Sequence, residues 1–103
     1  MSIYRKTRRA DEDLKEIYRY TRRTWGMAQA VRYVRQLEQR FSALAGNPLS
    51  GRERKDLQPP GLRSFVHGSH VVFYQPQPYG VLIVRVLHGR QDVSTHLGSG
   101  EEP

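Results

Sequence analysis

The sequence contains no cysteine, which excludes a disulfide scaffold and any metal site or nucleophile built on a thiol. It also lacks an apolar run near the ~20 residues of a membrane-spanning helix, and no apolar signal-peptide core follows Met1. We therefore expect no membrane partner. The absence of cysteine fits a reducing cytoplasm, which is the location we expect. With 103 residues, the chain has the length of one domain.

Acidic residues are scarce, and the positive charge is unevenly placed. Residues 1–60 hold 14 of the 17 basic residues but only 7 of the 10 acidic ones, whereas residues 61–103 are neutral overall. Of the 17 basic residues, 14 are arginine, whose planar fork suits carboxylates and phosphates. The charge therefore indicates an acidic partner, either a nucleic acid or an acidic protein segment.

Two helices are predicted in the first half, after a short strand at residues 3–6. Thr7 can cap the first helix, and an apolar stripe runs from Leu14 to Trp25, where Gly26 interrupts it. A second stripe runs from Ala30 to Leu44 with alternating spacings of four and three residues, which is typical of one buried helix face. The two stripes predict an antiparallel helical hairpin, with Trp25 in the core rather than serving as an interface anchor.

Three apolar runs in the second half predict an antiparallel three-stranded meander, at residues 62–66, 71–74 and 81–87. A connector over residues 47–61 is rich in proline, glycine and arginine. The order β-αα-βββ predicts an α+β domain over residues 1–97, with the helical hairpin packed on a small, mainly antiparallel sheet. Residues 98–103 are expected to form a flexible C-terminal tail.

Metal and cofactor motifs are missing from the sequence. His67 and His70 lie three residues apart around a turn without a third ligand, and no glycine-rich phosphate loop, nucleophile elbow or carboxylate pair is present. We therefore expect no metal and no cofactor, and any acid–base chemistry would fall to histidine and arginine.

One basic constellation remains on the last predicted strand. Strand alternation places Arg85 on the face opposite Val84 and Val86, so Arg85 emerges on the open side of the sheet if the latter face packs on the helices. Such a face could bind phosphate and transfer a proton. The side chains that could contribute are Arg63, Arg85, His88, Arg90 and His96. Alternatively, Arg85 pairs with a carboxylate and His88 is a polar cap at the strand end.

Five segments in order resemble the ParE branch of the RelE/ParE toxin superfamily. These segments are 13–20, 47–52, 61–64, 70–74 and 83–92. The resemblance covers roughly residues 3–97 and implies the β-αα-βββ fold. It also implies the toxin of a type II toxin–antitoxin system, which poisons DNA gyrase and is neutralised by the C-terminal segment of a ParD-like antitoxin. The RelE-type members instead cut mRNA in the ribosome.

The residues favour the gyrase-directed branch over the nuclease branch. RelE-type enzymes use several basic residues on the sheet face and often a tyrosine or histidine near the C-terminus. By motif, Arg63 and Arg90 keep two basic positions, Val71 stands where an arginine is usual, and the tyrosine position falls near His96. Losing one oriented cation from such a site should cost about 3 kcal/mol or more. We therefore predict no catalytic residue, with Arg63, Arg85 and Arg90 as candidates for binding the target.

The antitoxin is predicted to supply an acidic and apolar segment that folds on binding to form a hetero-oligomer. Its carboxylates would meet a set of arginines on the helical hairpin, unless these simply face solvent. The set is Arg19, Arg22, Arg23, Arg32, Arg35 and Arg40. Direct binding of nucleic acid, as by a non-toxic basic domain, is disfavoured.

Overall fold

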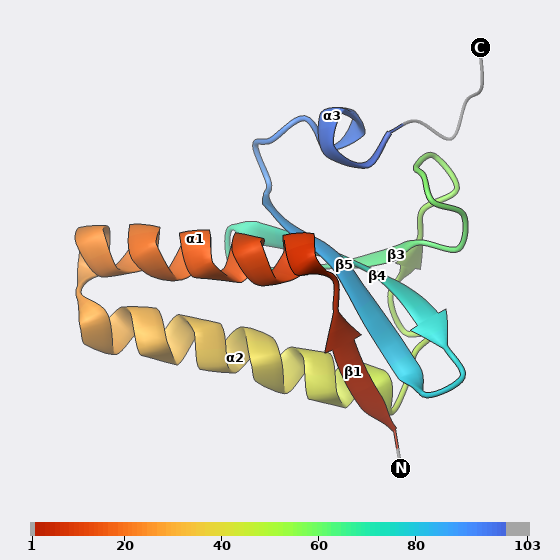
Figure 1. The fold of residues 1–103 in the computed structure, drawn as a ribbon, viewed down its shortest axis with the longest axis horizontal. Helices are drawn as coiled ribbons and strands as arrows, with labels where there is room; N and C mark the ends of the chain where they lie inside the picture. The colour runs from red at the N-terminus through yellow and green to blue at the C-terminus, as the bar shows by residue number, and fades with distance from the viewer. Residues whose placement is uncertain (1, 99–103) are drawn as a thin grey trace.

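The computed structural model describes residues 2–98, in which a helical hairpin packs on one face of a five-stranded sheet (Figure 1). The predicted β-αα-βββ order is confirmed, with two additions that the sequence analysis did not predict: the short strand β2 and the short helix α3. The elements are β1 (Ile3–Lys6), α1 (Arg8–Trp25), α2 (Met27–Ala45), β2 (Arg52–Glu53), β3 (Arg63–His67), β4 (His70–Gln77), β5 (Gly80–His88) and α3 (Val93–Leu97).

The sheet has the order β1-β5-β4-β3-β2. Strand β1 is parallel to β5, from Ile3 opposite Gly80 to Lys6 opposite Ile83, and the other pairings are antiparallel. The sheet is therefore mainly antiparallel, as predicted. Of the predicted flexible tail, only Gly98 is described, and its N–H donates to the Ser94 carbonyl at the end of α3. The remainder, residues 99–103, lies outside the described residues.

Local signals explain the helix boundaries. The Thr7 hydroxyl accepts a hydrogen bond from the Ala10 N–H at 3.0 Å, which caps α1. Gly26 ends α1 with φ of 96°, a left-handed conformation that favours glycine, and α2 begins at the next residue. Among residues 2–98, no helix is both long enough and apolar enough to cross a membrane.

The first core lies between the hairpin and the sheet. It contains most of the buried residues of both helices, together with residues from β4 and β5: Ala10, Leu14, Ile17, Leu37, Phe41, Leu44, Ala45, Val72, Tyr74, Val81, Ile83 and Val86. The predicted core position of Trp25 is wrong, because its side chain is 66% exposed. The hairpin extends beyond the sheet, so its far end has no layer to pack against (Figure 1).

A β-bulge in β5 changes which side chains face the helices. Phe73 of β4 pairs with Arg85, but the next residue, Tyr74, pairs with Ile83, so Val84 is an extra residue in β5. The bulge puts Ile83 and Val86 together in the helix-side core, although they are three residues apart. The prediction that Val84 and Val86 share the helix-facing side is therefore wrong, because simple alternation stops at the bulge.

The other face of the sheet is not open. Leu57 and Leu62 from the connector and Leu97 from α3 pack with Phe73 and Leu87 into a second core. All five side chains are less than 10% exposed. The sequence suggested an open, cationic face here. The structure instead has an apolar face that is covered by the connector and α3.

Candidate functional site

Arg85 is fixed in a buried ion pair with Asp13 of α1. Its Nε and Nη2 donate to the two carboxylate oxygens at 2.8 and 3.0 Å, and the Val86 N–H donates to the same carboxylate at 3.0 Å. The side chains are only 9% and 14% exposed, and the hydrogen bonds to Asp13 raise the pKa of Arg85. The expectation that Arg85 emerges on the open side of the sheet is therefore wrong, and the alternative pairing with a carboxylate is confirmed.

Arg63 is also occupied by contacts within the protein. Its Nη1 donates to the carbonyls of Leu49 and Gly51 at 3.1 and 2.7 Å, and its Nη2 donates to Glu53 at 3.2 Å. The side chain is 17% exposed. Arg63 thus ties the start of the connector to β3 and has little freedom to hold a phosphate.

The remaining nuclease candidates are exposed around the end of β5: His88 is its last residue, Arg90 lies on the following turn and His96 in α3. The Arg90 N–H donates to Nδ1 of His88, and Gln91 contacts both the His88 N–H and the His96 ring. His88 therefore caps the strand end, as the alternative interpretation proposed. The contacts described for this turn do not include Arg63 or Arg85, each of which has partners elsewhere.

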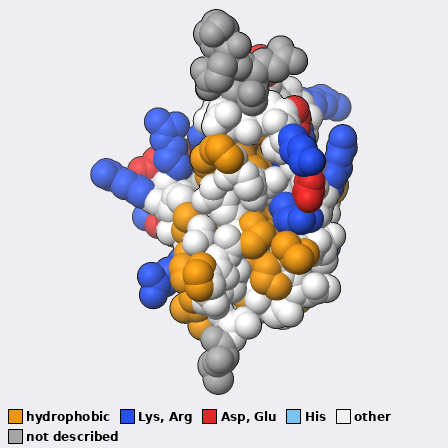
Figure 2. All heavy atoms as spheres, turned by 90° about the vertical axis from the view of Figure 1, so that its right-hand side faces the viewer, with side chains coloured by type: hydrophobic (Ala, Val, Ile, Leu, Met, Phe, Trp, Pro, Cys, Tyr) orange, Lys and Arg blue, Asp and Glu red, His pale blue; other side chains and the backbone are white. Residues whose placement is uncertain are grey.

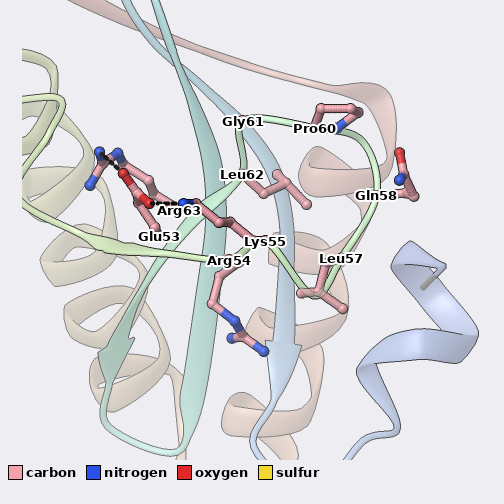
Figure 3. A pocket seen from close by; sticks show the side chains of 9 residues that line it. All are labelled: Glu53, Arg54, Lys55, Leu57, Gln58, Pro60, Gly61, Leu62 and Arg63. Carbon is pink, nitrogen blue, oxygen red and sulfur yellow. Dashed lines mark hydrogen bonds and ion pairs between the residues drawn. The ribbon is translucent and has the colours of Figure 1, made fainter. Parts of the chain in front are cut away.

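The connector lines an open pocket of about 330 Å³ beside β3 (Figure 3). Figure 3 shows Leu57 and Leu62 pointing into the curve of the loop, with Arg63 beside Glu53. Arg54 donates to Asp56 at 2.9 and 3.1 Å and lies 5.4 Å from the Phe73 ring. On the connector side of the molecule, acidic side chains lie beside basic ones, between separate hydrophobic patches (Figure 2). The cations of this pocket are thus already paired, which does not favour anion binding.

A larger groove of about 480 Å³ runs between α1, α2 and the end of β1. We call it the helix groove. Its apolar lining comes from Leu14, Tyr18 and Val34, and basic side chains surround them. The full lining is Lys6, Asp11, Leu14, Lys15, Tyr18, Arg19, Arg22, Val34 and Glu38. Asp11 contacts Lys6 and Lys15, each at 3.3 Å, and these contacts lower its pKa. The groove therefore combines an apolar surface with a basic rim.

The six predicted antitoxin-binding arginines do not form one surface. Arg19 and Arg22 line the helix groove, whereas Arg32 and Arg35 line a separate hollow on α2. Arg40 lies over the Phe65 ring at 4.6 Å, and Arg23 is exposed near the end of α1. The groove itself could not be recognised from the periodicity of the sequence, because Leu14, Tyr18 and Val34 fall on the two predicted core stripes. The neighbouring apolar pair Ile17 and Tyr18 was the available signal, since it widens the stripe beyond one buried face.

Three histidines meet Tyr33 of α2 where β3 and β5 end and β4 begins. The Tyr33 hydroxyl lies 2.7 Å from Nδ1 of His70 and donates to the His67 carbonyl at 3.1 Å. The rings of His70 and His88 are 5.6 Å apart. Burial, followed by repulsion from His88 and His67, lowers the pKa of His70 to about 4. Within residues 2–98, no group of three His, Cys, Asp or Glu side chains could hold a metal ion.

Acid should destabilise the protein through His70. Its pKa is about 4 in the folded state against 6.5 for an ordinary histidine, so the unfolded chain takes up the proton first. The resulting stability is present above pH 6.5 and is lost as the pH falls towards 4. Between pH 7 and pH 4.5 we expect a loss of roughly 1–2 kcal/mol, discounted for partial exposure. Urea unfolding at both pH values measures it.

The control variant His70→Asn keeps a side-chain amide that can donate to the Tyr33 hydroxyl but cannot be protonated in this range. It should show a smaller loss of stability over the same pH interval. An equal loss in the variant and the wild type would assign the acid effect to other groups.

The chain matches known toxins over most of its length. The family model described as the ParE toxin of the type II toxin–antitoxin system parDE matches residues 4–93. Toxin ParE1 of Caulobacter vibrioides is 40% identical over 98 residues, which cover 95% of this chain and all of that protein. Toxin ParE of Escherichia coli is also 40% identical over 98 residues, covering 94% of each chain.

A solved structure has the same fold. The match, titled as the chromosomal ParDE system from P. aeruginosa, gives a TM-score of 0.70 at 21% identity and covers 85% of this chain and 96% of the other. The element order and the five sequence segments agree with the match of the family model across β1 to β5. The chain belongs to the ParE toxin family of type II toxin–antitoxin systems.

Proposed function

We propose that this toxin acts by binding DNA gyrase and that it makes and breaks no covalent bond itself. The observation that carries the proposal is the state of the sheet face opposite the helices. Leu57, Leu62 and Leu97 cover that face, and Arg63 and Arg85 are bonded within the protein. A nuclease would need free, oriented cations there to stabilise the developing charge. Because gyrase acts on the bacterial chromosome, the proposal implies a cytoplasmic location.

The test compares the two branches with one protein preparation. In a supercoiling assay, the purified toxin should inhibit gyrase and accumulate cleaved DNA, whereas transcripts in a translation extract should stay intact. Cut transcripts together with unaffected gyrase would contradict the proposal. If this chain is itself the nuclease, Arg90→Ala should sharply reduce the cutting of transcripts. Cutting by a contaminating ribonuclease would not change in that variant.

The helix groove is the site that we propose for the antitoxin. An amphipathic acidic segment could place apolar side chains against Leu14, Tyr18 and Val34, with its carboxylates near the basic rim. Residues 17–37 contain five arginines and no acidic residue, so the hairpin favours such a segment electrostatically. Antitoxin and toxin would then form the predicted hetero-oligomer.

Reversing one rim charge should weaken this complex. We expect Arg22→Glu to reduce antitoxin affinity about tenfold or more, because it removes an attractive contact and adds repulsion at the groove. Isothermal titration with the purified antitoxin measures the change. Arg9→Glu is the matched control, because Arg9 is exposed on the same helix but does not line the groove. Equal losses in the two variants would indicate long-range attraction rather than binding in the groove.

A further inference from the structure

Three large apolar side chains are exposed around the turn of the helical hairpin. Tyr20, Trp25 and Met27 are 58%, 66% and 54% exposed. Among residues 2–98, the other exposed large apolar side chains are Ile3, Leu49 and Val66, on three separate parts of the sheet and connector. The concentration of exposed apolar surface between residues 20 and 27 therefore distinguishes this turn. We call Tyr20, Arg23, Trp25 and Met27 the hairpin tip.

The fold does not need the side chains of Trp25 and Met27. The last buried residue of α1 is Thr21 and the first of α2 is Ala30, so the segment between them packs on no core. The turn itself requires Gly26, whose φ is 96°, but it places no demand on a neighbouring tryptophan or methionine. Large exposed apolar groups gathered at one place indicate an interaction surface.

The chemistry of the tip fits an acidic protein surface. Tryptophan, tyrosine, methionine and arginine are enriched at protein interfaces, whereas lysine is depleted. The segment from residue 17 to residue 37 contains no lysine, aspartate or glutamate. A duplex phosphate backbone offers no apolar surface for Trp25 and Met27, so charge and apolar exposure together favour a protein partner with acidic groups around an apolar cleft.

We propose that the hairpin tip is the surface with which the toxin enters an acidic cleft of its target protein; this rests on the proposed function, in which that target is gyrase. The tip is the turn of a hairpin that projects beyond the sheet, a shape that fits a cleft in a folded partner (Figure 1). The helix groove is a hollow, which suits an antitoxin segment instead. Arg22 lines that groove one helical turn before Trp25, but none of the four residues of the tip does, so the groove and the tip are neighbouring, distinct surfaces.

The test uses Trp25→Ala and, as a matched control, Leu49→Ala, since both side chains are 66% exposed. Loss of a central tryptophan anchor should raise the toxin concentration that inhibits gyrase about 30-fold and abolish growth arrest on induction. Leu49→Ala should leave both readouts within twofold. Antitoxin affinity should also stay within twofold for Trp25→Ala, and thermal melting temperatures within about 3 °C of wild type.

Each alternative outcome has a defined meaning. If Trp25→Ala inhibits gyrase and arrests growth like wild type, the proposal for the tip is overturned while the proposed function stands. If wild type fails to inhibit gyrase, the proposed function is contradicted. Growth arrest then tests the hairpin tip by itself, and loss of growth arrest in Trp25→Ala would support contact between the tip and another target protein. A matching loss of antitoxin affinity would assign the tip to the antitoxin. Trp25-dependent binding of DNA or RNA alone would replace the protein cleft with a nucleic acid.

Discussion

Asp13→Asn should lower the free energy of unfolding by about 3–5 kcal/mol, because it leaves the Arg85 guanidinium buried without a counter-charge. The pair is bidentate, with N–O distances of 2.8 and 3.0 Å from Nε and Nη2, and Nη1 of Arg85 is buried with no hydrogen-bond partner among the described residues. A domain of this size is stable by roughly 5–15 kcal/mol in total. Urea unfolding at pH 7, followed by circular dichroism, measures the loss.

The matched control for this variant is Glu12→Gln on the same helix. Glu12 pairs with Arg8 at 3.5 Å, but both side chains are more than half exposed, so this pair should contribute less than about 1 kcal/mol. The double variant Asp13→Leu with Arg85→Met removes both charges and should recover much of the lost stability. If Asp13→Asn lowers the free energy of unfolding no more than Glu12→Gln does, the burial of Arg85 does not require Asp13 as its counter-charge.

The position of Asp13 shows what the buried ion pair contributes in return for the free-energy cost of removing two charges from water. Strand β1 pairs with β5 only as far as Ile83, where the bulge begins. Beyond that point, the Thr7 hydroxyl donates to the Val84 carbonyl at 2.8 Å, and Asp13 accepts from the Val86 N–H. Side chains of the α1 N-terminus thus take over the edge of β5 where the neighbouring strand ends. The ion pair therefore holds the α1 N-terminus against the edge of β5.

Features with local causes could be predicted from the sequence. The Thr7 cap, the break at Gly26 and the two buried helix stripes each depend on residues close together in the chain, and the structure has all of them. The three main strands were predicted for the same reason, since their apolar runs are bounded by turn residues. Their order, together with five segments, was enough to indicate the family.

Features that depend on two distant segments could not be predicted. The bulge at Val84 is a mismatch between β4 and β5, so the alternation of β5 alone gave the wrong face for Ile83 and Val84. The periodicity of α1 placed Trp25 on the buried stripe but contains no information about where the sheet ends. The composition of the hairpin predicts its positive charge. Composition does not predict that the arginines lie on several separate surfaces, as they do in the structure.

The connector motif at residues 47–52 depends on a close approach that only glycine allows. Tyr74 is fully buried, and its hydroxyl donates to the Pro48 carbonyl at 2.7 Å and accepts from the Gly51 N–H at 2.8 Å. A Cβ on Gly51 would lie 2.5 Å from that hydroxyl oxygen and 3.0 Å from the Ser64 carbonyl oxygen. The start of the connector is therefore held against β4 and β3 through one tyrosine.

Gly51→Ala should cost about 3 kcal/mol, because the methyl group must push away the Tyr74 ring and weaken both of its hydrogen bonds. Gly46→Ala is the matched control: its Cβ would meet only the Ala43 carbonyl at 3.6 Å, and its backbone is already helical, so we expect a neutral or slightly stabilising change. In a Tyr74→Phe background the nearest clashing atom is gone, and Gly51→Ala should cost less than it does alone. Thermal and urea unfolding of the wild type, the two single variants Gly51→Ala and Tyr74→Phe, and the double variant gives the coupling energy. If the losses of stability were strictly additive, the cost of Gly51→Ala would not arise from the contact with Tyr74.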